Sequence, residues 1–152
     1  MPDTDSPRPA VTVATIVVRD GAFLCVEEHT RSGVRINQPA GHLELGESIV
    51  AAAARETLEE TGYHVVPVAL VGIYRWQAPG TASTFVRFAF EAHVTAHDAG
   101  RPLDRGIVRA DWFDYATLTA RRAEHRSPLV IRCVDDFLRG QRMPLSLLTE
   151  MA

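Results

Sequence analysis

The first two-thirds of the chain show mainly strand-like patterns of apolar and polar residues. Ala10–Arg19 is almost continuously apolar and β-branched, which is typical of a strand buried on both faces. Asp20 and Gly21 follow as a two-residue hairpin signal, so the next segment returns as the partner strand. Pro67 favours an edge or bulged strand. The other predicted strands are Ala22–Glu28, Val34–Ala40, His64–Tyr74, Thr84–Thr95 and Ile107–Phe113.

The alternation is clearest in Thr84–Thr95, where successive side chains would point to opposite faces of a sheet. One face carries Phe85, Arg87, Ala89 and Glu91, and the other carries Val86, Phe88, Phe90 and Ala92. Polar segments at 30–33, 76–83 and 96–106 predict loops between the strands.

Helical patterns appear once in the middle of the chain and again near its end. Ser48–Thr61 is rich in alanine and other helix formers, and Gly62 supplies a C-terminal stop. Asp114–Ala120 and Ser127–Arg139 predict two further helices, the last of them ended by Gly140. This order of elements predicts the α/β fold class, with a mixed central sheet between helices.

The chain has 152 residues, enough for one domain with a substantial core, which we expect at 10–148. The acidic, proline-rich residues 1–9 are predicted to form a mobile tail without a signal-peptide core. The formal net charge of −3 argues against a nucleic-acid partner. No apolar run approaches the roughly 20 residues of a membrane span. Cys25 and Cys133 lack metal or redox spacing, and a reducing cytoplasm is the expected location.

Three carboxylates lie where a helix disfavours them. Glu56, Glu59 and Glu60 fall in the last two turns of Ser48–Thr61, at the negative end of the helix dipole. Their i, i+3, i+4 spacing places them on one arc of about 100°, so they also repel one another. A bound divalent cation would reverse the sign of these terms, and oxygen ligands suit Mg²⁺ or Mn²⁺. The alternative is a solvated acidic face.

The residues around these carboxylates are consistent with a built site. Arg55 can pair with Glu59 or reach back to Glu47, and so hold carboxylates in place when metal is absent. Glu47 is alternatively an acid favoured near a helix N-terminus. Gly41 permits close approach of the backbone to a metal or phosphate. The opposite arc is expected to pack on the sheet and leave the charged face exposed: Val50, Ala54, Thr57, Leu58 and Thr61.

The segment Gly41–Tyr63, GHLELGESIVAAAARETLEETGY, resembles the signature of the Nudix hydrolases. Its fixed polar and glycine positions are all filled, by Gly41, Glu47, Arg55, Glu56, Glu59, Glu60 and Gly62. Thr57 departs from the signature, because an aliphatic residue is usual there. The resemblance implies an α/β/α sandwich with a mixed central sheet, beside which the signature forms a loop–helix–loop motif.

The resemblance also implies roles for the matched residues. Glu56, Glu59 and Glu60 would bind one or more Mg²⁺ or Mn²⁺ ions, with the Gly41 carbonyl as a further ligand, and Arg55 and Glu47 would orient them. Glu59 is the first candidate for the general base, although it is alternatively a ligand alone. Family members also draw this base from outside the signature, and the candidates here are Asp98, Asp104 and Asp111.

Segments outside the signature resemble the NudJ-type phosphatases. The similar segments are Phe23–Glu28, Asn37–Glu44, Arg126–Val130 and Ile131–Leu145. This resemblance implies release of orthophosphate from nucleoside tri- and diphosphates, thiamine diphosphate or hydroxymethylpyrimidine diphosphate. The alternatives are a MutT-like or nucleotide-sugar pyrophosphohydrolase and a non-catalytic, nucleotide-sensing Nudix domain. The partner expected in each case is a small phosphorylated molecule, and the protein is either a monomer or a homodimer.

Four side chains are candidates for substrate contact, each with an ordinary structural alternative. Trp76 would stack on a ring of the substrate or be a rim or core aromatic. Arg87 would meet a phosphate or be a solvated or ion-paired strand residue. Gln38 would contact substrate or satisfy nearby backbone groups. Arg126 precedes Ser127, and this helix start would bind phosphate or be a plain N-cap.

Overall fold

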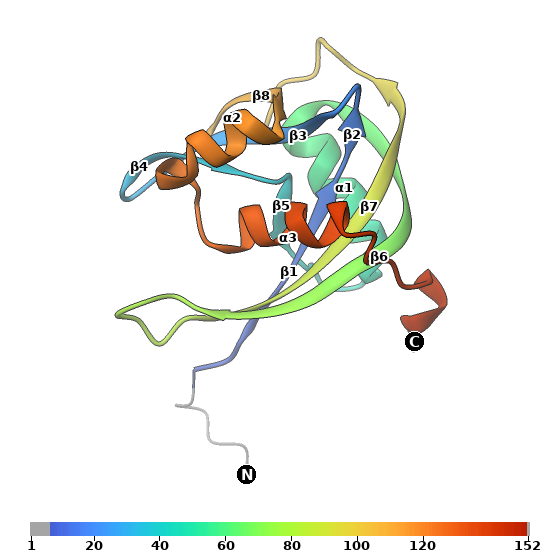
Figure 1. Cartoon of the computed structure of the whole chain (residues 1–152). Helices are drawn as coiled ribbons and strands as arrows, with labels where there is room; N and C mark the ends of the chain where they lie inside the picture. Colours follow the sequence, from blue (N-terminus) through green and yellow to red (C-terminus); the bar gives the residue numbers. More distant parts are fainter. Residues whose placement is uncertain (1–6, 152) are drawn as a thin grey trace.

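A computed structural model describes residues 7–151 of the chain. Its mixed four-stranded sheet has the order β5-β1-β7-β6 (Figure 1). The two central strands β1 and β7 run parallel, whereas β5 and β6 pair antiparallel with them at the edges. The bounds of these strands are β1 Ala10–Ile16, β5 Ala40–His42, β6 Tyr63–Gln77 and β7 Thr84–His97. The predicted mixed sheet is confirmed.

A second, antiparallel sheet was not predicted. In it β3 pairs with β2, β4 and β8. The expected continuous strand over 10–19 is wrong, because the chain leaves the first sheet at Val17 and enters the second. Val17 is buried at this corner, and its carbonyl accepts a hydrogen bond from the Leu24 N–H at 2.9 Å. The bounds are β2 Val18–Arg19, β3 Ala22–Thr30, β4 Gly33–Asn37 and β8 Ile107–Asp114.

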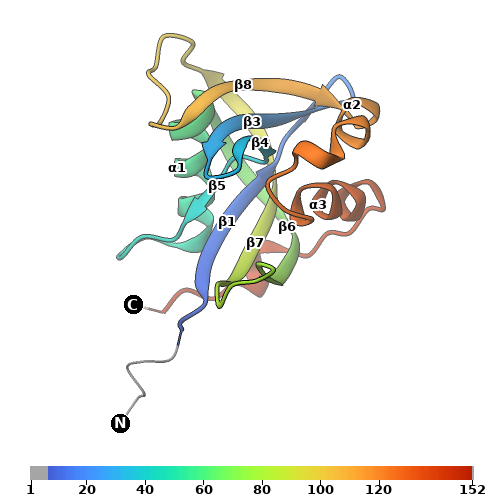
Figure 2. The same ribbon diagram turned by 90° about the vertical axis from the view of Figure 1, so that its left-hand side faces the viewer.

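Helices cover both faces of the mixed sheet, as Figure 2 shows with α1 on one side and α3 on the other. Val13 and Phe90 of the sheet pack on Ala52 and Ala53 of α1. On the opposite face, Ala89 belongs to the core formed with α3. The bounds are α1 Ile49–Thr61, α2 Tyr115–Ala120 and α3 Leu129–Leu138, with short 3₁₀ turns at Arg122–Glu124 and Leu145–Leu147. The α/β/α architecture and the alternation within β7 are thus confirmed.

The hairpin and edge-strand signals are also confirmed. Arg19 faces Ala22 across the turn, and both turn residues have left-handed backbone, with φ of 52° at Asp20 and 75° at Gly21. The strand that contains Pro67 lies at the edge of its sheet and carries register shifts. This strand extends to Gln77, so the expected loop at 76–83 begins two residues too early.

The buried face of α1 differs from the expected one. Its buried residues are Ala52, Ala53, Glu56, Thr57, Glu60 and Thr61. Leu58 is only partly buried, whereas Glu56 is 9% exposed and Glu60 is 7% exposed. The expectation that the charged face is held out into solvent is therefore wrong for two of the three glutamates. Thr57 is fully buried, and its hydroxyl lies 2.7 Å from that of Thr15 on β1, so a polar contact replaces the usual aliphatic one.

The proposed tail at 1–9 lies largely outside the described residues. Of its members, Pro7, Arg8 and Pro9 are exposed and have no regular secondary structure. Both Cys25 and Cys133 are buried free thiols, as expected. Among residues 7–151, none of the helices has the length and apolar character needed to cross a membrane.

Candidate active site

Local capping fixes the position of the acidic helix. Ser48 is the N-cap of α1, and its side chain accepts a hydrogen bond from the Ala51 N–H at 3.0 Å. Gly62 ends the helix with φ of 76°, and its N–H bonds to the Leu58 carbonyl. Both boundaries agree with the sequence pattern to within one residue. The helix end therefore presents the glutamates from a rigid element.

Arg55 connects the acidic residues of the motif. Its guanidinium forms a two-point ion pair with Glu47, at 2.8 Å from Nε and 2.7 Å from Nη2. Nη1 also donates to Glu56 Oε1 at 2.8 Å and to Glu59 Oε2 at 3.0 Å. Nη2 donates to the carbonyl of His42 at 3.1 Å. The arginine thus brings two helix carboxylates and the preceding loop to one point.

A group of three carboxylates lies close enough together to hold a metal ion. One oxygen each from Glu56, Glu59 and Asp104 lies within 4.8 Å of the others. Asp104 comes from the loop after β7 and is anchored there, since its N–H donates to the Glu59 carbonyl at 2.9 Å. Of the three candidates for a general base outside the signature, Asp104 belongs to the cluster. Asp111 instead pairs with Arg109 at 2.9 Å, and Asp98 lines a different pocket.

Glu60 occupies a separate position beside this group. Its Oε1 accepts a hydrogen bond from the Ala40 N–H at 2.8 Å. Burial raises the pKa of Glu60 to about 9, and it also raises the pKa of Glu56 against the opposing effect of Arg55. Both carboxylates are held in an environment that disfavours their negative charge. A nearby cation would favour the charged forms.

Gly41 approaches the acidic group too closely for any side chain. A Cβ atom built on this residue would overlap the carboxylate of Glu56. The backbone of β5 can lie against the glutamate only because residue 41 is glycine. The donor set of the cluster consists of carboxylate oxygens, which are ligands that Mg²⁺ and Mn²⁺ favour. The residues present therefore fit a divalent ion.

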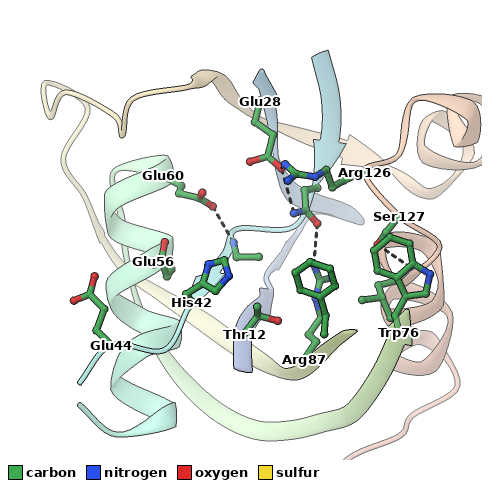
Figure 3. Close-up of a pocket in the computed structure, with 15 residues that line it drawn as sticks. Thr12, Glu28, His42, Glu44, Glu56, Glu60, Trp76, Arg87, Arg126 and Ser127 are labelled. Carbon is green, nitrogen blue, oxygen red and sulfur yellow. Dashed lines mark hydrogen bonds and ion pairs between the residues drawn. The ribbon is translucent and has the colours of Figure 1, made fainter. Parts of the chain in front are cut away.

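A cavity of about 460 Å³ opens beside the carboxylates. Figure 3 shows Glu44, Glu56 and Glu60 on one side of it and Trp76 and Ser127 on the other. The side chains that line it come from both sheets, α1 and the start of α3: Thr12, Glu28, Asn37, His42, Glu44, Glu56, Glu60, Trp76, Phe85, Arg87, Arg126, Ser127 and Leu129. One end of the cavity is therefore lined by acidic side chains, and the other end is lined by aromatic side chains.

Three of the four substrate-contact candidates line this cavity. Trp76 packs on Phe85 with ring centroids 5.8 Å apart. Arg126 pairs with Glu28 at 2.7 Å at the rim. Arg87 is 5% exposed, so the alternative of a solvated strand arginine is wrong.

Gln38 does not line the cavity. It is 2% exposed, its Nε2 donates to the Val130 carbonyl at 2.7 Å, and its Oε1 accepts from Arg87 Nη1 at 2.9 Å. Gln38 therefore satisfies nearby buried groups, which was the alternative to a substrate contact. Ser127 Oγ accepts a hydrogen bond from the Leu129 N–H at 3.2 Å, but the N-cap of α3 is Pro128, so the expected helix start at Ser127 is one residue early.

Several polar residues of the cavity were missed from the sequence, among them Glu28 and Asn37. Glu28 lies near the end of β3, where the alternating pattern gave no reason to separate it from an ordinary strand glutamate. Asn37 is the last residue of β4, next to Gln38, and its amide contacts both Glu28 and Arg87. The pairing of Glu28 with Arg126 joins distant parts of the chain, so residue spacing could not reveal it.

Comparisons with known proteins agree with this geometry. A Nudix domain model matches residues 6–133. The phosphatase NudJ of Escherichia coli K12 is 38% identical over 141 residues, which cover 93% of this chain and 91% of that protein. NudJ of Shigella sonnei shows the same identity and coverage.

Solved structures show the same similarity. A Nudix hydrolase from Nitrosomonas europaea has a TM-score of 0.92 at 46% identity, covering 95% of this chain and 98% of the other. The MutT Nudix hydrolase of Burkholderia pseudomallei has a TM-score of 0.68 at 18% identity, covering 86% and 98%, and so shares the fold. On the evidence of the motif, the fold and these relatives, the chain belongs to the Nudix family and is a Nudix hydrolase.

Proposed function

We propose that the protein is a divalent-metal-dependent phosphatase that releases orthophosphate from small substrates with a phosphoanhydride. The observation that carries this proposal is that carboxylate oxygens of Glu56, Glu59 and Asp104 lie within 4.8 Å of one another, and that Glu56 also lines the cavity. Like charges repel at short range, and a divalent cation would offset this repulsion in addition to the ion pairs from Arg55. Mg²⁺ is the expected ion, and Mn²⁺ is the alternative.

The ligands would be the carboxylates of Glu56, Glu59 and Glu60, with the Gly41 carbonyl and Asp104 as neighbours. A bound ion would neutralise charge on phosphate oxygens and lower the pKa of a water molecule. Arg55, held by Glu47, would keep Glu56 and Glu59 in one orientation. Glu59 is the most exposed of the three glutamates and is our first candidate to accept the proton from the attacking water, with Asp104 as the alternative.

The substrate class follows from the two ends of the cavity. A diphosphate would lie toward the acidic end, and a planar ring would stack near Trp76 and Phe85. Candidate substrates are nucleoside tri- and diphosphates, thiamine diphosphate and hydroxymethylpyrimidine diphosphate. The similarity to phosphatases named NudJ, at 38% identity over 93% of the chain, supports orthophosphate release. A cytoplasmic location and the choice between monomer and homodimer stay predictions.

Product analysis tests this function. The purified protein would be incubated with GTP, GDP or thiamine diphosphate, with Mg²⁺ or with a chelator. We expect orthophosphate as the product, only with metal, and strongly reduced turnover in Glu59→Gln. Pyrophosphate and a monophosphate from GTP would instead indicate a MutT-like pyrophosphohydrolase. Nucleotide binding without turnover would support a sensing domain, and full activity of Glu59→Gln would contradict the assigned role.

A further inference from the structure

Arg87 is a buried cation whose contacts leave its charge uncompensated. The side chain is 5% exposed and lines the cavity. Nη1 donates to Gln38 Oε1 at 2.9 Å and Nη2 donates to Asn37 Oδ1 at 3.1 Å, both of them neutral amide oxygens. Nε is buried without a hydrogen-bond partner in the described part of the chain. Burying a charge without a partner of opposite sign costs free energy, and a bound anion would reduce this cost.

Acidic residues in this part of the fold do not supply that partner. Within residues 7–151, the ion pairs of the molecule do not include Arg87. Glu28 is paired with Arg126 at 2.7 Å, and the amide of Asn37 lies between Glu28 and Arg87. The buried carboxylate of Asp136 is taken by the Tyr74 hydroxyl at 2.8 Å and by two arginines of the α3 segment, Arg132 and Arg139.

Cys133, another neighbour of Arg87, is neutral. Burial raises the pKa of the Cys133 thiol, and the nearby guanidinium only partly opposes this, so the sulfur carries no compensating negative charge at neutral pH. The two amides of Asn37 and Gln38 fix the orientation of the guanidinium without neutralising it. Figure 3 shows the Arg87 side chain between the acidic residues on one side and Trp76 on the other.

We propose that Arg87 forms a metal-independent anion subsite in this cavity, which binds a phosphoryl group of the substrate or of a product. An arginine held by neutral acceptors keeps its charge available to a phosphate, and it does so without the carboxylates of α1. The inference rests on the proposed function only for the identity of the anion. It adds to that function a second point of attachment, separate from the divalent ion.

Binding to metal-free protein tests the subsite. The full chain, kept in a chelator at constant ionic strength, would be titrated by calorimetry with orthophosphate and, separately, with GMP. We expect the wild type to bind at least one of these anions. Orthophosphate binding would assign the subsite to the released phosphate, and GMP binding alone would assign it to the phosphate that stays on the organic product.

Substitutions at position 87 identify the residue responsible. Arg87→Met should weaken anion binding at least tenfold, and Arg87→Lys, which keeps the charge but loses the planar fork, should give an intermediate loss. The matched control is Arg75→Met, an exposed arginine on the adjacent strand β6 outside the cavity lining, which should bind as the wild type does. Thermal shifts on adding the anion, each measured against the same variant without anion, provide a second readout if Arg87→Met is less stable.

Two results would overturn the proposal. One is metal-free wild type that binds neither anion, and the other is Arg87→Met or Arg87→Lys with unchanged affinity. A purely structural role for Arg87 predicts the second result together with a lower melting temperature. These measurements use neither metal nor turnover, so a failure to release orthophosphate from any substrate would overturn the proposed function and leave the subsite standing.

Discussion

Glu47 and Arg55 form a two-point ion pair, with distances of 2.8 Å and 2.7 Å between their nitrogen and oxygen atoms. The pair joins the loop before α1 to the face of the helix that carries the acidic cluster. The pKa of Glu47 is lowered, chiefly by its hydrogen bonds from Arg55. With Glu47 in place, Arg55 can reach Glu56 and Glu59 in fixed geometry, so we assign Glu47 a positioning role.

Glu47→Gln should reduce the affinity for Mn²⁺ by about 10- to 100-fold, in line with the loss of other groups that orient metal ligands. The substitution leaves Arg55 free to rotate away from the helix carboxylates. Mn²⁺ binding would be followed by electron paramagnetic resonance. Glu124→Gln is the control, because it removes a carboxylate from an arginine ion pair, 2.8 Å from Arg121, outside the cavity lining. Equal affinities in the two variants would contradict the positioning role.

Gly41→Ala should fold normally but lose activity, by about 100-fold if the acidic group moves by about 1 Å. The added Cβ overlaps the carboxylate end of the Glu56 side chain, so this side chain must shift from its position while the backbone of β5 stays in place. Melting temperature and orthophosphate release are the measurements. Gly100→Ala is the matched control, since a Cβ at that position meets open space. An active Gly41→Ala variant would show that close approach of the backbone is unimportant.

Removal of metal should destabilise the protein by restoring repulsion among the carboxylates. Adding Mg²⁺ to the wild type is expected to raise the melting temperature, because a ligand that binds only the folded state stabilises it. Glu59→Gln removes one charge from the cluster, so its metal-free melting temperature should be equal or higher, and its response to Mg²⁺ smaller. Differential scanning calorimetry checks both. An equal response in the two proteins would contradict the cluster as the binding site.

Stability should fall in acid through His125, which is partly buried. Its Nε2 lies 2.9 Å from the Leu118 carbonyl, and its Nδ1 is buried without a partner in the described chain. Burial lowers the pKa of His125 below 6.5. The unfolded chain therefore binds a proton that the folded chain resists, so the free energy of unfolding decreases as pH falls through about 6.5.

His125→Gln should make this decrease smaller between pH 7.5 and pH 5.5, as measured by denaturant unfolding at each pH. His29→Gln, at an exposed position on β3, is the control for removing any histidine. If both variants reduce the pH dependence equally, the burial of His125 is not the cause.

The sequence predicted the parts of this molecule that depend on local chemistry. The turn at Asp20 and Gly21, the end of α1 at Gly62 and the edge position of Pro67 each follow from backbone preferences of single residues. The grouping of Glu56, Glu59 and Glu60 could also be predicted, because their spacing places them on one face of α1. The corner at Val17 could not, since a continuous apolar run is equally typical of one strand or of two strands in different sheets.

The features that the sequence did not predict depend on contacts between distant segments of the chain. The burial of Glu56 and Glu60 depends on where β5 passes the helix, and the position of Asp104 depends on a loop bonded to the Glu59 carbonyl. For Arg87, the sequence indicated only that the residue lies on a regular strand. Its burial and its neutral partners come from the end of β4, which no periodicity connects to it.

A crystal of the protein soaked with Mn²⁺ and measured for anomalous scattering would show directly whether a metal binds at the end of α1. We predict an anomalous peak within coordination distance of carboxylate oxygens of Glu56 and Glu59, with Asp104 or Glu60 close by. A well-diffracting soaked crystal in which these side chains point into solvent, with no manganese among them, would contradict the central claim.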